Sequence, residues 1–225
     1  MIPKILHYVW VGSDIPERVQ SLINHNKTHT PDYEIRVWTE QNLPKLNKFA
    51  KNAYGKKNWA FVSDYVRFVA LRQYGGIYLD TDQKLLKNID DLLSLSFFAG
   101  WNKEETHIYT GIIGCVPESE LVDRMLESYD EVDFDVSQSH KMHTSPIILT
   151  SCFKDQATDV NCKIFDNRYF YPLQPGEKDN GTIFPDAYAV HLWDESWVRF
   201  LRLRRFLRRI GFIRCYQYVR RRLNV

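Results

Sequence analysis

Apolar and polar side chains near the start of the chain follow two different periods, which together predict a β-α-β unit. The run from Lys4 to Val11 is apolar and aromatic almost throughout and stops at Gly12, which is typical of a strand buried on both faces. Residues 16–30 have the pattern of a helix, and residues 33–38 alternate in the manner of a strand. This order predicts a mostly parallel central sheet with helices on its faces.

The segment from Trp59 to Tyr74 has the clearest helical pattern in the chain. Apolar side chains occur nearly all round this predicted helix, so we expect it to be buried. Ser63, Asp64 and Arg67 interrupt the apolar surface, and at helical spacing they fall within one arc of about 100°. The glycine pair at residues 75–76 then predicts the end of the helix.

Two carboxylates follow a short predicted strand at residues 77–79. Side chains two apart on an extended segment point the same way, so Asp80 and Asp82 are expected to converge. Two buried carboxylates are costly unless a cation or protons compensate them, and such oxygen ligands suit Mg²⁺ or Mn²⁺. The end of a strand is also where open α/β sheets bind ligands. The alternative is a solvated acidic turn, since D-x-D recurs by chance.

Asp64 and Arg67 lie three residues apart on one face of the predicted helix, and two interpretations remain open. They could form a structural ion pair within a crowded helix. Alternatively, Asp64 binds ribose hydroxyls or the base while Arg67 contacts phosphate or the sugar.

Weaker patterns along the second half predict strands at residues 97–101, 108–116 and 188–193 and a helix at residues 119–129. Gly111 and Gly114 would leave room for a sugar, or they could serve tight packing. No repeat or linker divides the body, so we expect one domain over residues 1–197.

Composition is that of a globular protein, with 44% hydrophobic and 26% charged residues, but the charge is unevenly distributed. The net charge of +2 includes ten arginines between Arg199 and Arg222, and no acidic residue follows Glu195. Residues 198–225 therefore predict a basic amphipathic helical tail, which would bind an anionic membrane surface through residues 199–223. Docking of the tail on the acidic body is the alternative. Nucleic-acid binding is disfavoured because the body has no matching basic surface.

The cysteines and the apolar segments bear on the compartment. The four cysteines have no paired spacing and indicate reduced thiols in a cytoplasmic protein. We find no pattern of a signal peptide and no run of about 20 apolar residues. We expect a cytoplasmic protein, peripheral on the inner face of the membrane.

Several segments resemble glycosyltransferase family 32, which groups bacterial capsular and lipopolysaccharide sugar transferases with yeast Golgi mannosyltransferases. The resemblance is most specific in the blocks AFVSDYVR, residues 60–67, and YGGIYLDTD, residues 74–82. The opening IPKILHYVW, residues 2–10, is similar to the first strand of the family. His191 with Ser196 and Trp197 resembles its closing element. The catalytic domains of the large clostridial glucosylating toxins share a similar pattern.

This resemblance implies a GT-A fold, a divalent cation (Mn²⁺ or Mg²⁺), and sugar transfer with retention of anomeric configuration. It makes Asp80 and Asp82 the D-x-D carboxylates and ligands of the metal, with Asp82 favoured over Asp80 as the direct ligand. It places Asp64 and Arg67 on the donor sugar and ribose. The remaining implied contacts are Tyr78 near the nucleotide, Val9 and Trp10 at the base, His191 on the metal, and Ser196 and Trp197 at the metal and diphosphate.

The expected activity is transfer of a hexose or N-acetylhexosamine from a nucleotide diphosphate sugar, with UDP favoured over GDP by the bacterial and toxin relatives. The acceptor would be a glycan, lipid-linked, in bacterial surface polysaccharide synthesis. One alternative is a catalytically weak nucleotide-sugar-binding protein of the same fold. Another is a metal-dependent nucleotide-diphosphate hydrolase, which would need further acidic or histidine ligands beside the aspartates.

Overall fold

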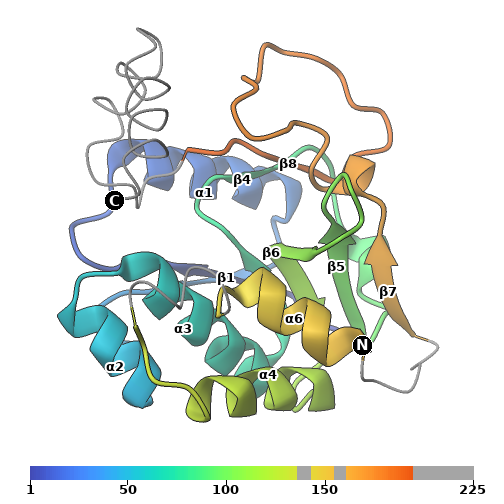
Figure 1. The fold of residues 1–225 in the computed structure, drawn as a ribbon. Coiled ribbons are helices and arrows are strands. Elements are labelled where there is room, and N and C mark those ends of the chain that lie inside the picture. The colour runs from blue at the N-terminus through green and yellow to red at the C-terminus, as the bar shows by residue number, and fades with distance from the viewer. Residues whose placement is uncertain (136–142, 155–160, 195–225) are drawn as a thin grey trace, which may run out of the picture. The chain divides into compact units, whose positions relative to one another are not determined.

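A central six-stranded sheet organises the protein, which we describe from a computed structural model covering residues 1–135, 143–154 and 161–194 (Figure 1). The strand order is β2-β1-β3-β6-β5-β7. The bounds are β1 Ile5–Val9, β2 Glu34–Trp38, β3 Gly76–Leu79, β5 Phe97–Trp101, β6 Ile108–Cys115 and β7 Cys162–Phe165. A second, two-stranded sheet pairs β4, Gln83–Leu85, with β8, Ala189–His191.

The strand directions confirm the predicted, mostly parallel sheet. β1 pairs in parallel with β2 on one side and with β3 on the other, and β5 pairs in parallel with β7. β6 runs antiparallel to its neighbours β3 and β5. The carboxyl ends of β1, β2 and β3 therefore meet at the same edge of the sheet.

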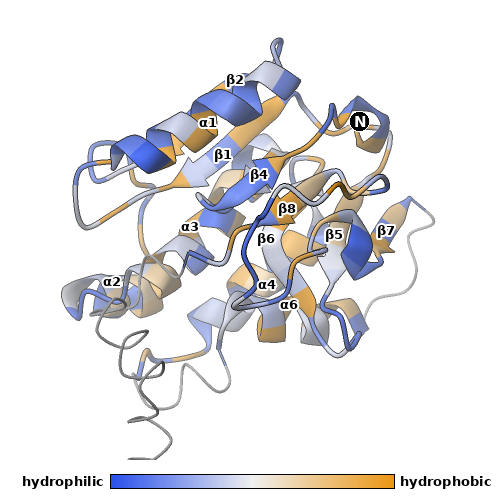
Figure 2. Ribbon diagram, turned by 90° about the horizontal axis from the view of Figure 1, so that it is seen from above, coloured by the Kyte–Doolittle hydropathy of each residue, from blue (hydrophilic) through white to orange (hydrophobic). Residues whose placement is uncertain are grey.

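Helices cover both faces of this sheet, as the sequence predicts. The helices are α1 Glu17–His29, α2 Lys48–Gly55, α3 Trp59–Tyr74, α4 Glu120–Asp130 and α6 Ser145–Lys154, with short 3-10 turns η1 Asp90–Leu92 and η2 Asn167–Tyr169. One core lies between the sheet and α2, α3, α4 and α6. A second core lies on the opposite face, beneath α1 and the β4–β8 ribbon (Figure 1). α1 is hydrophilic over much of its surface (Figure 2), and it buries Val19 and Ile23 against this second core.

The central helix α3 begins and ends where the sequence predicts. It is enclosed by other helices and by the sheet, which explains why apolar side chains occur all round it. Its end depends on Gly75, which has a φ of +58° and leaves no space for a side chain. A Cβ atom there would lie 2.6 Å from the backbone nitrogen of Pro117. Glycine is required at this position both by backbone conformation and by packing.

Met1–Trp193 forms one compact unit, and the second unit, Asp194–Val225, lies almost wholly outside the described residues. The predicted basic tail and the predicted domain boundary at residue 197 are outside them as well. No helix within the described ranges is both long and apolar enough to span a bilayer. Cys115 and Cys152 are free thiols, and Cys115 is fully buried.

Candidate functional site

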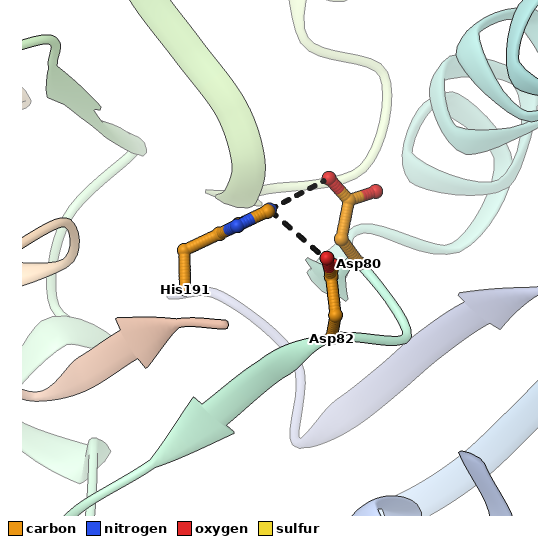
Figure 3. A group of neighbouring side chains, drawn as sticks. All are labelled: Asp80, Asp82 and His191. Carbon is orange, nitrogen blue, oxygen red and sulfur yellow. Dashed lines mark ion pairs between the residues drawn. The ribbon is translucent and has the colours of Figure 1, made fainter. Parts of the chain in front are cut away.

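Asp80, Asp82 and His191 converge at the carboxyl edge of the sheet (Figure 3). Asp80 follows β3, Asp82 precedes β4, and His191 is the last residue of β8. His191 Nε2 lies 3.6 Å from Asp80 Oδ2 and 3.3 Å from Asp82 Oδ1. One ligand atom from each of the three residues lies within 4.8 Å of the other two. The structure thus brings these three side chains together, and their role as metal ligands stays a prediction.

Backbone hydrogen bonds show how the chain brings these side chains together. The two aspartates lie in a tight turn, closed by the Gln83 amide donating to the Asp80 carbonyl at 2.9 Å. The prediction that Asp80 and Asp82 lie on an extended segment is therefore wrong. Their side chains do converge, but the turn brings them together. Gln83 pairs with His191 in the β4–β8 ribbon, and the Leu192 amide donates to the Asp82 carbonyl at 2.9 Å. This short ribbon carries the histidine to the aspartates.

Gly111 on β6 lies directly against the cluster. A Cβ atom at this position would be 2.9 Å from His191 Cδ2 and 3.1 Å from Asp80 Oδ2. At Gly114, a Cβ atom would lie 2.0 Å from the Phe98 ring. Of the two sequence interpretations, tight packing therefore describes both glycines, and the space that they leave is occupied by protein atoms.

Arg67 places a positive charge beside Asp64 and Asp80. Its Nη2 atom lies 2.9 Å from Asp64 Oδ1 and 3.3 Å from Asp80 Oδ1. Nη1 donates to the carbonyl and hydroxyl of Thr110 at 2.8 and 3.2 Å, and the guanidinium stacks over the Tyr78 ring at 4.4 Å. The side chain is only 6% exposed, so this charge is retained in the interior because several partners compensate it.

Asp64 is engaged by α6 as well as by Arg67. Its carboxylate accepts hydrogen bonds from the Ser145 hydroxyl at 2.6 Å and from the Ser145 amide at 3.0 Å. The Ser145 hydroxyl also lies 2.7 Å from Thr110 Oγ1. The structural ion pair considered for Asp64 and Arg67 is thus present, and it extends to Asp80. Contacts of Asp64 with a donor sugar or ribose stay a prediction.

The environment of Asp80 keeps its carboxyl group ionised. Burial raises its pKa, but the Arg67 charge together with hydrogen bonds from His191 and Tyr78 outweighs burial and lowers the pKa to about 2. The Tyr78 hydroxyl donates to Asp80 Oδ1 at 2.7 Å. Arg67 and Tyr78 therefore hold Oδ1, while Oδ2 faces His191.

The other predicted site residues have different surroundings. Tyr78 is 1% exposed and lies behind Asp80, so its proximity to a nucleotide stays a prediction. Val9 is buried in the core beneath α3, whereas the half-buried Trp10 packs on the opposite face and donates from Nε1 to the Asp14 carbonyl at 3.1 Å. Ser196 and Trp197 lie outside the described residues.

Three residues at the site were not predicted from sequence. Thr110 and Ser145 bind the Asp64–Arg67 pair, and Trp193 contacts His191. The Trp193 amide donates to His191 Nδ1 at 3.2 Å, and the ring centroids of the two side chains lie 4.2 Å apart. None of these three side chains carries a charge or fits a metal-ligand spacing. The sequence therefore did not indicate their contacts with the site residues, although they lie close to predicted elements.

The side chains present fit a divalent cation. Carboxylates suit Mg²⁺ and Mn²⁺, and an added imidazole favours a transition metal such as Mn²⁺. Three protein ligands leave coordination positions for water and phosphate oxygens. Because Nδ1 of His191 accepts a hydrogen bond, the neutral ring carries its proton on Nε2 in this arrangement. Binding of a cation by Nε2 requires the other tautomer, and hence opening of the Trp193 amide contact.

Comparison with known proteins points to sugar transferases. Residues 16–99 match the family described as "Glycosyltransferase sugar-binding region containing DXD motif". An uncharacterised glycosyltransferase of Acanthamoeba polyphaga mimivirus is 25% identical over 90% of this chain and 86% of its own length. Mannosyl phosphorylinositol ceramide synthase of Saccharomyces cerevisiae is 26% identical over 68% of this chain, which spans 42% of that protein. Inositol phosphoceramide mannosyltransferase 1 of Schizosaccharomyces pombe is 31% identical over 43% of this chain and 33% of its own length.

Solved structures share the fold. The PaToxG glycosyltransferase superposes with a TM-score of 0.56 at 16% identity, over 68% of this chain and 69% of that one. A glycosyltransferase involved in glycosylation of the major capsid of PBCV-1 has a TM-score of 0.51 at 12% identity, over 84% of this chain and 93% of that one. The mixed α/β architecture is therefore that of solved glycosyltransferases.

Proposed function

We propose that this protein is a metal-dependent glycosyltransferase of the GT-A type, using a nucleotide diphosphate sugar as its donor. The observation that carries the proposal is the convergence of Asp80, Asp82 and His191 within 4.8 Å of one another, inside a glycosyltransferase-like fold. The match of residues 16–99 to the DXD-containing sugar-binding region supports it, because that segment includes both aspartates.

In this proposal Asp80, Asp82 and His191 hold Mn²⁺ or Mg²⁺, with Asp82 the principal ligand. The bound ion would compensate the negative charge that develops on the leaving diphosphate. Arg67 and Tyr78 orient Asp80 by occupying Oδ1, so that Oδ2 is directed toward the cation position. The ionised state of Asp80 is maintained by the same contacts, because they hold its pKa near 2.

The donor contacts are assigned by position at the same edge of the sheet. Val9 is the last residue of β1 and Trp10 follows it, next to the end of β3, and we assign both to the base. Asp64 accepts two hydrogen bonds from Ser145, and we assign its carboxylate in addition to a hydroxyl of the donor sugar or ribose. Ser196 and Trp197 are assigned to the metal and diphosphate from the sequence resemblance. We propose transfer with retention of configuration, with both D-x-D carboxylates acting as metal ligands and neither acting as a nucleophile.

The transferred sugar is a hexose or an N-acetylhexosamine, and we favour UDP as the carrier. A lipid-linked acceptor is supported by the names of the fungal relatives, which specify ceramide substrates. A place in bacterial surface polysaccharide synthesis rests on the sequence resemblance, as does membrane binding through residues 199–223. With such an acceptor the protein would act in the cytoplasm at the inner face of the membrane.

Ligand-dependent thermal stability tests this proposal. The full-length protein would be melted with a panel of UDP- and GDP-sugars, each in Mn²⁺ and in EDTA, beside Asp82→Asn and a control, Asp133→Asn. Asp133 is 69% exposed and pairs with Lys48 on the surface, so its replacement removes a carboxylate without touching the site. We expect one nucleotide class to raise the melting temperature only with Mn²⁺, in wild type and control but not in Asp82→Asn.

An equal shift in EDTA, or none with any nucleotide, would refute the donor site. Product analysis then separates transfer from the alternatives. A transferase forms glycoside much faster than it hydrolyses donor when acceptor is present. A hydrolase releases free sugar at a rate that acceptor does not change, and a binding protein forms neither product.

A further inference from the structure

Trp193 has a backbone conformation that is unusual for a bulky residue. Its φ angle is +53°, in the left-handed region that favours glycine and asparagine. Within the described part of the chain, the other non-glycine residues with positive φ are Lys57, Glu105 and Glu118, which are polar and exposed. Strain of this kind persists only where surrounding contacts maintain it, and it is concentrated at functional positions.

Specific contacts of the indole maintain this conformation. Its Nε1–H donates to the Leu173 carbonyl at 2.9 Å. The ring also packs against Tyr109 and Tyr171, with centroid separations of 5.6 and 6.4 Å. On the chain just before Trp193, the Leu192 amide is bound to the Asp82 carbonyl. The strained residue is thus anchored through both its side chain and its preceding peptide.

The consequence of this anchoring is seen at His191, two residues earlier. The indole and the imidazole have centroids 4.2 Å apart at an interplanar angle of 46°. The Trp193 amide also donates to Nδ1 at 3.2 Å. The indole restricts rotation of the histidine ring whether or not a cation is bound, whereas the amide contact does so only while Nδ1 carries no proton. Nε2 of this ring faces Asp80 and Asp82.

We infer that Trp193 is a positioning residue for the cation site, acting through His191. This inference rests on the proposed function, because it concerns the same three ligands. Trp193 offers no ligand atom itself. Its indole fixes the ring that does, and residues that orient a metal-binding histidine typically contribute 10–100-fold to metal affinity.

The test measures Mn²⁺ binding to the full-length protein, with and without UDP, from the loss of the electron paramagnetic resonance signal of free Mn²⁺. We expect Trp193→Ala to weaken Mn²⁺ binding about 10-fold or more. Trp193→Phe keeps a ring against His191 and loses only the bond to Leu173, so it should restore most of the affinity. If Trp193→Ala does not fold, the Mn²⁺ affinity is compared between wild type and Trp193→Phe instead.

A double-mutant cycle shows whether the effect passes through His191. In a His191→Ala background, Trp193→Ala should weaken Mn²⁺ binding no further. The matched control is Trp38→Ala, because Trp38 also stacks on a histidine and donates to its Nδ1, but at His7, within the core. This control should lower the melting temperature and leave Mn²⁺ affinity as in wild type.

The outcomes separate this inference from the proposed function. Wild-type affinity for Mn²⁺ in Trp193→Ala, or tighter binding, would overturn the positioning role while the cation site stands. An equal loss with and without His191 would overturn it as well, because the effect would then be independent of that ring. Failure of the wild type itself to bind Mn²⁺ under either condition would overturn the proposed cation site and this inference together.

Discussion

Replacement of Gly111 by alanine tests the packing beneath the proposed cation site most directly. The added Cβ would lie 2.9 Å from His191 Cδ2, 3.1 Å from Asp80 Oδ2 and 3.2 Å from His191 Nε2. Non-bonded carbon atoms prefer about 3.5–4.0 Å, so the histidine must move by roughly 0.6–1 Å. Metal–ligand distances tolerate about 0.2 Å, which this displacement exceeds several-fold.

The expected effect on the site is larger than the effect on folding. Displacement of a ligand on this scale should weaken Mn²⁺ binding about 10–100-fold, which is about 1.4–2.8 kcal/mol. Glycine to alanine in a strand would otherwise stabilise the fold by about 0.5–1 kcal/mol, but overpacking costs about 1–3 kcal/mol. The free energy of unfolding should therefore fall by no more than about 2.5 kcal/mol.

Two other glycines provide matched controls in the same assays of Mn²⁺ affinity and urea unfolding. Gly55 at the end of α2 has open space around its Cβ position, so Gly55→Ala should leave Mn²⁺ binding unchanged and stabilise the fold slightly. Gly114→Ala collides with the Phe98 ring and should destabilise the fold without lowering the Mn²⁺ affinity of the folded protein. Wild-type Mn²⁺ affinity in Gly111→Ala would refute the reasoning.

Two further predictions concern buried charge. Arg67→Met leaves Asp64 and Asp80 without their counter-ion and should lower the free energy of unfolding, measured in urea titrations, by about 3–5 kcal/mol. Arg67→Lys keeps the charge but not the planar fork, so it should lower the free energy of unfolding by less. A loss below about 1 kcal/mol in Arg67→Met would contradict this account. Burial lowers the pKa of His7 to about 4, so the unfolded chain binds a proton there between pH 6.5 and 4 that the folded state does not. The contribution of neutral His7 to the free energy of unfolding is complete above pH 6.5 and should fall by about 3 kcal/mol toward pH 4. His7→Gln should remove this pH dependence. If the dependence persists in that variant, His7 is not its source.

Local patterns were sufficient to predict the opening β-α-β unit, α3 and the strand that leads to Asp80. Each of these elements is long, or strongly apolar, or ended by glycine, so tertiary context did not override the pattern. β5 was also predicted, from a weaker pattern. The mostly parallel sheet followed from the order of these elements.

The elements that escaped prediction are short or have mixed patterns. β4 and β7 contain three and four residues, which is too few for a period to be read. α2 has eight residues and ends on a glycine. α6 contains β-branched residues that weaken a helical interpretation, although Pro146 in its first turn is a usual start signal for a helix.

Much of the site depends on contacts between distant segments. Asp64 binds Ser145 across 81 residues, and no spacing rule connects them. His191 was proposed as a ligand from resemblance, but its approach to the aspartates is achieved by pairing of β4 with β8. The site residues that the sequence identified are thus held by residues that carry no signal of their own: Thr110 binds Arg67, and Trp193 contacts His191.

The β4–β8 ribbon also determines when the site can be completed during synthesis. About 110 residues separate Asp82 from His191, which a ribosome adds in roughly 5–20 s at 5–20 residues per second. Throughout that interval the nascent chain contains both aspartates without the histidine that β8 brings to them. Full affinity for a cation would therefore be acquired late, after most of the central sheet has been synthesised. The ion would then favour the finished domain over its partly synthesised forms.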